Sequence, residues 1–308
     1  MTGYAEVVPV YCFDPREFGV HALGFPRTGS HRARFLLESV AALRHSLAQA
    51  GSTLVVRSGH PVDVLPELAR QWNAEVVIAT SGYATEELAI EDDLKRRLAA
   101  LDISLELHWQ HTLVHREALP FALENLPPVF TGFRKKVEKL SPIREPLPAP
   151  ERIDTPAIDD PGTLPDYADL GLTPPTPDER SVLPFTGGEE AGRKRLHHYL
   201  WDTEALSRYK YTRNGLVGAV YSSKFSPWLS LGCLSPRSIY AEIKRYEAQI
   251  VKNASTYWLV FELLWRDYFC FVALLHGHHV FLQGGIRQLK RQYLRNRPMF
   301  EQWTRGET

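Results

Sequence analysis

The chain has 308 residues, of which 44% are hydrophobic and 23% charged, and this length predicts two folded domains. Its formal net charge of zero conceals an asymmetry: residues 1–183 hold 18 Lys and Arg against 26 Asp and Glu, whereas residues 184–308 hold 18 against 10. The odd cysteine count and wide cysteine spacing (Cys12, Cys233, Cys270) argue against a disulfide framework or a zinc site. No apolar run is long enough to span a membrane and no signal pattern opens the chain, so we expect a soluble cytoplasmic protein.

Strand-like and helix-like segments alternate through the first 140 residues. β-branched apolar runs predict buried strands, and apolar residues three and four apart predict the helices between them. The predicted strands are residues 6–13, 53–57, 75–80 and 103–108, and the predicted helices are residues 30–50, 61–72 and 86–101. We expect Ser30 to cap the first helix, whose inward stripe is Leu36, Val40, Leu43 and Leu47. This alternation is typical of a doubly wound parallel sheet, and the absence of Gly-x-Gly-x-x-Gly and Walker loops argues against a dinucleotide oxidoreductase.

The second half of the chain has a different organisation. Prolines crowd residues 141–183, where acids are frequent and large apolar residues few, so we expect an interdomain linker with no packed element. The linker would separate an α/β domain at residues 1–140 from an all-α domain at residues 184–308. Helices are predicted at residues 189–201, 236–247 and 257–275.

One helix face in the second half is too polar for an ordinary core. Trp258, Glu262, Trp265 and Arg266 stand at i, i+4, i+7 and i+8, which places two indoles, a carboxylate and a guanidinium together. Burying an ionised Glu is unfavourable unless a partner offsets the lost hydration. Two interpretations stay open: a half-exposed Glu262–Arg266 salt bridge beside packed tryptophans, or a pocket for a flat, partly anionic ligand such as a flavin or a nucleobase.

A polar segment interrupts the predicted helices between residues 209 and 229. Ser222, Ser223, Lys224 and Ser226 come just before Pro227, which suits the first position of a helix. Hydroxyls and a lysine at a helix N-terminus are typical of a phosphate site, although serines before proline also act as ordinary caps. The histidines show no metal-binding pattern, and we expect no metal site at any of them (His111, His115, His276, His278, His279).

Several longer motifs follow one another in a fixed order along nearly the whole chain. In the second half they are Tyr-Lys-x-Thr-Arg-Asn-Gly (209–215), Ser-Ser-Lys-Phe-Ser-Pro-Trp-Leu (222–229), Leu-Gly-Cys-Leu-Ser-Pro-Arg (231–237) and Ser-Thr-Tyr-Trp-x-x-Phe-Glu-Leu-Leu-Trp-Arg-Asp-Tyr-Phe (255–269). Residues 8–16, 57–59 and 129–138 add three more in the first half. Together they resemble the photolyase/cryptochrome family, and within it the DASH cryptochromes.

The resemblance implies a Rossmann-like α/β antenna domain followed by a helical FAD-binding domain. FAD would contact Arg266 beside its isoalloxazine ring and, near its phosphates and ribityl chain, Tyr209, Ser222, Ser223, Lys224, Phe225 and Ser226. Trp258 and Glu262 belong to the same implied cofactor site. Glu262 and Trp265 match positions that contact a pyrimidine dimer, which gives them the catalytic role, and Arg213 matches a position that contacts DNA. An antenna folate, methenyltetrahydrofolate, would contact Glu86.

The chain departs from the family pattern in three places. It begins near what would be the family's second strand, and it stops at Thr308, before the helices that carry the partner of flavin N5 and the flavin-proximal tryptophans. Tyr293 stands where the family usually has the surface tryptophan of its electron-transfer chain. We therefore expect a sheet without its first strand, a partial helical domain, and weak FAD binding by the isolated chain.

The function implied by the resemblance is FAD-dependent, blue-light-driven repair of cyclobutane pyrimidine dimers. Single strands are the expected substrate because flipping a base out of them costs least. The expected partner is single-stranded or damaged DNA, with no membrane contact, and the protein is expected to be a monomer. Two alternatives stay open: a blue-light receptor or nucleic-acid-binding regulator without repair activity, and an inactive flavin-free fragment.

Overall fold

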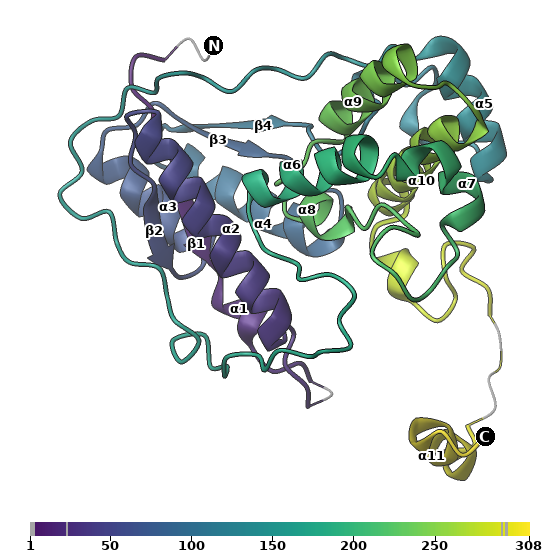
Figure 1. Cartoon of the computed structure of the whole chain (residues 1–308). Coiled ribbons are helices and arrows are strands. Elements are labelled where there is room, and N and C mark those ends of the chain that lie inside the picture. Colours follow the sequence, from purple (N-terminus) through teal and green to yellow (C-terminus); the bar gives the residue numbers. More distant parts are fainter. Residues whose placement is uncertain (1–3, 23, 291, 293–294) are drawn as a thin grey trace.

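A computed structural model of the chain describes residues 4–22, 24–290, 292 and 295–308. Its N-terminal half combines short parallel strands with helices, and its C-terminal half is helical (Figure 1). This arrangement confirms the predicted α/β domain followed by a helical domain. Within the described residues, no helix has both the length and the apolar character that crossing a membrane would require.

The α/β half contains two separate pairs of parallel strands. β1 (Val10–Phe13) pairs with β2 (Val55–Ser58), and β3 (Val76–Thr80) pairs with β4 (Ser104–His108). In the part of the chain that the structure describes, no ladder joins β1 to β3, so the predicted sheet is divided into two. The helices of this half are α1 (Pro15–Phe18), α2 (Ser30–Gln49), α3 (Pro61–Gln71) and α4 (Thr85–Ala99).

Three expectations for this half are wrong in detail. The first strand begins at Val10 rather than at residue 6, because Pro9 has no N–H to offer a ladder and can only accept, as it does from the N–H of Val55 at 2.9 Å. Ser30 lies inside α2, whose N-cap is Gly29. Leu43 is 45% exposed, so it does not belong to the buried stripe of α2.

The proline-rich segment forms no helix or strand between α5 (Phe130–Leu140) and α6 (Glu189–His197), yet it is bound closely to the α/β half. The N–H of Val56 donates to the carbonyl of Pro161 at 2.8 Å, and Leu170, 9% exposed, joins the apolar cluster beneath α2. Gly162 has φ +71°, and a Cβ there would collide with the carbonyl of Val56. The segment therefore runs as an ordered strap along β2, rather than as a free linker.

The helical half is centred on α10 (Ala254–His276), beside which α5 packs, whereas the last helix lies apart from it in Figure 1. It begins three residues earlier than predicted because Asn253 and Thr256 form a capping box. The main core cluster extends from α10 to Leu113, Phe130 and Phe133, which come from the N-terminal side of the strap. The remaining helices are α7 (Tyr209–Thr212), α8 (Ser226–Ser230), α9 (Pro236–Gln249) and α11 (Arg297–Arg305).

Candidate functional site

A cavity of about 430 Å³ opens beside the middle of α10. Its polar lining from α10 is Glu262 and Arg266, one turn apart on the same face. A cavity of this volume falls in the range of about 300–1,000 Å³ that small-molecule sites occupy. The whole lining is Tyr83, Tyr209, Ser223, Phe225, Ser226, Leu229, Leu259, Glu262, Leu263, Arg266, Phe269 and Cys270. Six residues predicted for a cofactor site are therefore brought together: Tyr209, Ser223, Phe225, Ser226, Glu262 and Arg266.

The hydroxyl-rich loop before α8 forms one wall of this cavity. Ser223 and Ser226 line it, whereas Ser222 and Lys224 are not among its lining residues. Lys224 has φ 57°, the left-handed conformation that side chains other than glycine seldom adopt. The loop is therefore held in one specific shape rather than merely capping α8.

Glu262 and Arg266 do not form the salt bridge that their spacing allowed. Glu262 accepts instead from Nη1 of Arg213 at 2.7 Å, and both side chains are about one-third exposed. Arg266 donates to the carbonyl of His111 and, at 3.4 Å, to the carbonyl of Leu229. The carboxylate and the guanidinium are thus separately held, which rules out the simple i,i+4 interpretation of this face.

The Tyr209 hydroxyl and the Cys270 thiol in the cavity wall keep their protons near neutral pH. Burial, reinforced by the charge of Glu262, raises the pKa of the Tyr209 hydroxyl to about 12. Burial also raises the pKa of the Cys270 thiol to about 11. Neither group is an activated nucleophile or base. The wall is therefore suited to holding a ligand that carries its own reactivity.

The two predicted tryptophans lie outside the cavity lining. Trp265 stacks on Phe130 of α5 with ring centres 3.7 Å apart, and Trp258 stacks on Phe261 at 4.8 Å. At about 100° per residue, Trp265 lies about 60° to one side of Glu262 and Arg266 about 40° to the other. The two edges of this wide stripe face different neighbours, so neither tryptophan lines the cavity, and contact of either with a ligand stays a prediction.

Comparison with known proteins shows which family the chain resembles. Residues 2–151 match the family model described as DNA photolyase. A cryptochrome DASH of Gloeobacter violaceus is 51% identical over 304 residues, which are 99% of this chain and 61% of that protein. This chain belongs to the photolyase/cryptochrome family.

Solved structures of the family share the fold. The Synechocystis sp. PCC6803 cryptochrome superposes with a TM-score of 0.92 at 45% identity, over 98% of this chain and 62% of that one. An archaeal photolyase from Sulfolobus tokodaii, described with two FAD molecules, gives a TM-score of 0.72 at 21% identity over 98% of this chain and 61% of its own, a likeness of fold alone. The chain thus spans about three-fifths of the length of these relatives.

Glu86, the residue that resemblance placed beside an antenna folate, lies far from α10 in the sequence and lines a different cavity. It is in the first turn of α4 and forms an ion pair with Arg27 at 2.5 Å. This cavity has a volume of about 610 Å³ and a lining of mixed charge: Asp14, Arg16, Glu17, Arg27, Thr28, Arg32, Val62, Glu86, Glu87, Ala89, Ile90 and Asp93. The cavity beside α10 and the cavity that Glu86 lines are therefore separate.

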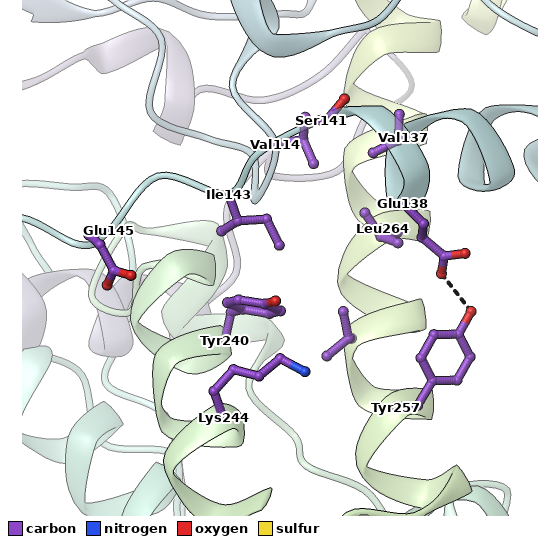
Figure 2. Close-up of a pocket in the computed structure, with 11 residues that line it drawn as sticks. Val114, Val137, Glu138, Ser141, Ile143, Glu145, Tyr240, Lys244, Tyr257 and Leu264 are labelled. Carbon is purple, nitrogen blue, oxygen red and sulfur yellow. Dashed lines mark hydrogen bonds between the residues drawn. The ribbon is translucent and has the colours of Figure 1, made fainter. Parts of the chain in front are cut away.

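A third cavity of about 590 Å³ lies between α5, α9 and α10 (Figure 2). Figure 2 shows Glu138 and Tyr257 joined across one wall, where the Tyr257 hydroxyl donates to Glu138 at 2.6 Å. Lys244, on the opposite helix, is paired with Glu247 at 2.7 Å. None of the predicted site residues lines this cavity, and four of its polar side chains, that of Ser141 included, already have protein partners.

Two buried charged residues escaped the sequence analysis. Asp267 is 0% exposed and accepts from the N–H groups of Leu113 at 2.9 Å and Val114 at 2.8 Å. Arg195 is 5% exposed and binds the loop before α8. The sequence offers only a weak signal that these two residues are buried. Asp267 directly follows Trp265 and Arg266 in an otherwise apolar helix, and Arg195 is one of several basic residues in a row.

The remaining predicted residues have the following placements. Within the described residues, no group of three or more His, Cys, Asp and Glu side chains is arranged to hold a metal ion.

Arg213, the predicted DNA contact, lies at the rim of the cavity beside Glu262, with its guanidinium 5.5 Å from the ring centre of Trp258. Tyr293 lies outside the described residues.

Proposed function

We propose that the cavity beside α10 binds FAD and serves light-driven repair of cyclobutane pyrimidine dimers in single-stranded DNA. The observation that carries the proposal is the convergence of Glu262, Arg266 and the Ser223–Ser226 loop on one cavity. The fit to a flavin is chemical. Apolar and aromatic side chains, including Phe269 and Tyr83, offer surfaces for a flat ring, while hydroxyls and a guanidinium suit its phosphates and carbonyls.

When bound in its reduced form and excited by light, the flavin supplies the electron that opens the cyclobutane ring and afterwards takes it back. The protein side chains orient the reactants and exclude water. Arg213 holds the Glu262 carboxylate at the cavity rim, where it can accept a hydrogen bond from a flipped pyrimidine. The neutral Tyr209 hydroxyl can donate a hydrogen bond without adding charge.

DNA binding would use the basic side of the same rim. Lys210 and Arg213 both lie over Trp258, with the Lys210 nitrogen 5.0 Å from its ring centre. These cations suit phosphate contacts, in keeping with the excess of Lys and Arg over Asp and Glu in residues 184–308. Trp265 packs α10 against α5 through its stack on Phe130, and this stack would have to open for a flipped base to stack on the indole.

Three finer expectations belong to the same proposal. Glu86 would hold a methenyltetrahydrofolate antenna in the separate α/β cavity, where its carboxylate already has Arg27 as a partner. The protein would act as a monomer, and it would act in the cytoplasm.

The first experiment is the visible absorption spectrum of the purified 308-residue chain titrated with FAD. It is followed by a blue-light repair assay on a dimer in single-stranded DNA, with a protein of the relatives' full length assayed beside it. Glu262→Gln should lower the repair yield with FAD retained, whereas Glu124→Gln, at an exposed position, should leave both unchanged. FAD binding with no repair in either protein would refute repair and favour a light receptor. No FAD binding by either would refute the proposal altogether.

A further inference from the structure

Arg195 is a buried cation with no acidic partner. It lies on α6, is 5% exposed, and forms no ion pair with any acid in the described part of the chain. Burial lowers the pKa of its guanidinium, the Cζ of which lies 5.3 Å from the ring centre of Tyr199. Its Nη1 is buried without a hydrogen-bond partner. A buried charge is costly unless it is paired, so the surroundings of this arginine require an explanation.

The other donors of Arg195 all go to carbonyls of the loop before α8. Nη2 donates to Ala219 at 2.6 Å and to Ser222 at 3.2 Å, and Nε donates to Ser223 at 3.0 Å. The Ser223 carbonyl belongs to the peptide unit that leads into the left-handed Lys224. Arg195 therefore fixes the backbone on the side where the loop is most strained.

Holding these carbonyls also sets the direction of the loop's N–H groups. The described peptide bonds are trans, and in a planar trans peptide the N–H points opposite to the C=O. The N–H groups of Val220, Ser223 and Lys224 therefore point away from Arg195. Among the described residues, none of these three N–H groups has a protein acceptor. Successive free backbone N–H groups in a turn make an anion-binding concavity.

We propose that Arg195 is a positioning residue for the diphosphate of the cofactor: it pins the Ala219–Ser223 carbonyls, turns the opposite N–H groups toward the ligand, and supplies a buried positive charge. The inference rests on the proposed function, because it assigns the phosphate end of the same ligand to this loop. The negative ligand would balance a charge that the described protein leaves without an acid, which explains why the burial is tolerated.

The test compares three variants of the 308-residue chain. Arg195→Gln removes the charge and most donors, and Arg195→Lys keeps the charge but cannot reach three carbonyls in the fork geometry of a guanidinium. Arg193→Gln is the matched control, since Arg193 is on the same helix, 66% exposed, and paired with Glu189. Two readouts are used: hydrogen exchange of residues 219–226 without ligand, and binding of FAD, ADP and riboflavin.

We expect Arg195→Gln to accelerate exchange in residues 219–226 and to weaken FAD and ADP by about tenfold to a hundredfold, as expected for lost charge-assisted hydrogen bonds. Riboflavin lacks the diphosphate and should change by less than about twofold on the same reasoning. Arg195→Lys should show part of both effects, and it replaces Arg195→Gln if that variant does not fold. The control should match the wild type.

Two results overturn the inference. Unchanged exchange in residues 219–226 in both Arg195 variants would show that the arginine does not hold the loop. Equal losses for riboflavin and ADP would show general damage to the cavity rather than positioning of phosphate. If the 308-residue wild type binds neither FAD nor ADP, the phosphate role of Arg195 fails for this chain, whereas the proposed function fails only if the full-length protein also binds no FAD. Exchange then still shows whether the arginine holds the loop.

Discussion

Replacing Asp267 by Asn tests the contact between α10 and the loop after β4. Its two oxygens accept from Leu113 and Val114, which are 0% and 1% exposed. An amide can accept only one of these N–H groups and turns its own NH2 toward the other. Asp267→Asn should therefore destabilise the protonated protein by about 1–3 kcal/mol, the cost of one buried unsatisfied donor.

The same variant should also change the pH dependence of stability. Burial raises the pKa of the Asp267 carboxyl to about 7 from 3.8, against the opposing effect of its two hydrogen bonds. Because the folded pKa exceeds the unfolded one, the stabilising contribution of the bound proton is complete below pH 3.8. It is lost as the pH rises toward about 7. The difference between a pKa of 3.8 and one of about 7 corresponds to about 4 kcal/mol of folding free energy. Asp267→Asn has no carboxyl to titrate at this position, so its stability should not fall by this amount as the pH rises.

Urea unfolding followed by tryptophan fluorescence between pH 4 and pH 8 measures both effects. The wild type should be the more stable at pH 4, and its advantage over Asp267→Asn should shrink or reverse by pH 8. The difference between the two proteins cancels the other titrating groups, since these are common to both. One pKa unit is worth about 1.4 kcal/mol. If the difference in unfolding free energy between the two proteins stays constant within about 1 kcal/mol from pH 4 to pH 8, the pKa of Asp267 is not raised as described.

Three further substitutions test the packing around the site by urea unfolding. Trp265→Ala should cost about 3 kcal/mol because its stack on Phe130 is lost, and an unchanged stability would mean that the stack contributes nothing. Gly187→Ala should cost about 1–3 kcal/mol because a Cβ there would collide with α2. The control Gly19→Ala, where a Cβ would meet its nearest atoms at ordinary contact distance, should stay within about 0.5 kcal/mol, and equal costs would contradict the collision. Tyr257→Phe should cost about 1 kcal/mol, since its half-exposed hydroxyl makes two hydrogen bonds, and a larger loss would point to a role beyond them.

The predictable part of the fold was the part that local patterns determine. α10 was found from its apolar periodicity, and its start was missed only because the cap at Asn253 was not recognised. The sequence pattern located all four strands. Their division into two separate sheets depends on which strands form hydrogen bonds with each other, and periodicity along the sequence does not determine this pairing. The strap was recognised from its prolines, whereas its attachment to β2 depends on backbone contacts such as that of Pro161 with Val56.

The site was predicted as a set of residues but not as a set of partners. Spacing along the helix suggested that Glu262 pairs with Arg266, yet its actual partner, Arg213, is 49 residues away in the sequence. Arg195 stands in a run of basic residues with Arg193, and its carbonyl acceptors lie 24 to 28 residues away in the sequence. Partners that are distant in sequence become visible only when the chain is folded.

Two consecutive residues of α10 connect the proposed cofactor site to the α/β half of the protein. Arg266 donates to the carbonyl of His111, and Asp267 accepts from the N–H groups two and three residues farther along the same loop. The loop is thus held by a hydrogen-bond donor, Arg266, and by an acceptor, Asp267, at successive positions of α10. Because the carbonyl and the N–H groups of the loop must each meet the matching side chain, the loop cannot shift along the helix without losing these bonds. Because the guanidinium that lines the cavity takes one acceptor from this loop, the shape of the cavity depends on the α/β half. A helical half without the loop would leave Arg266 with the more distant carbonyl of Leu229, at 3.4 Å.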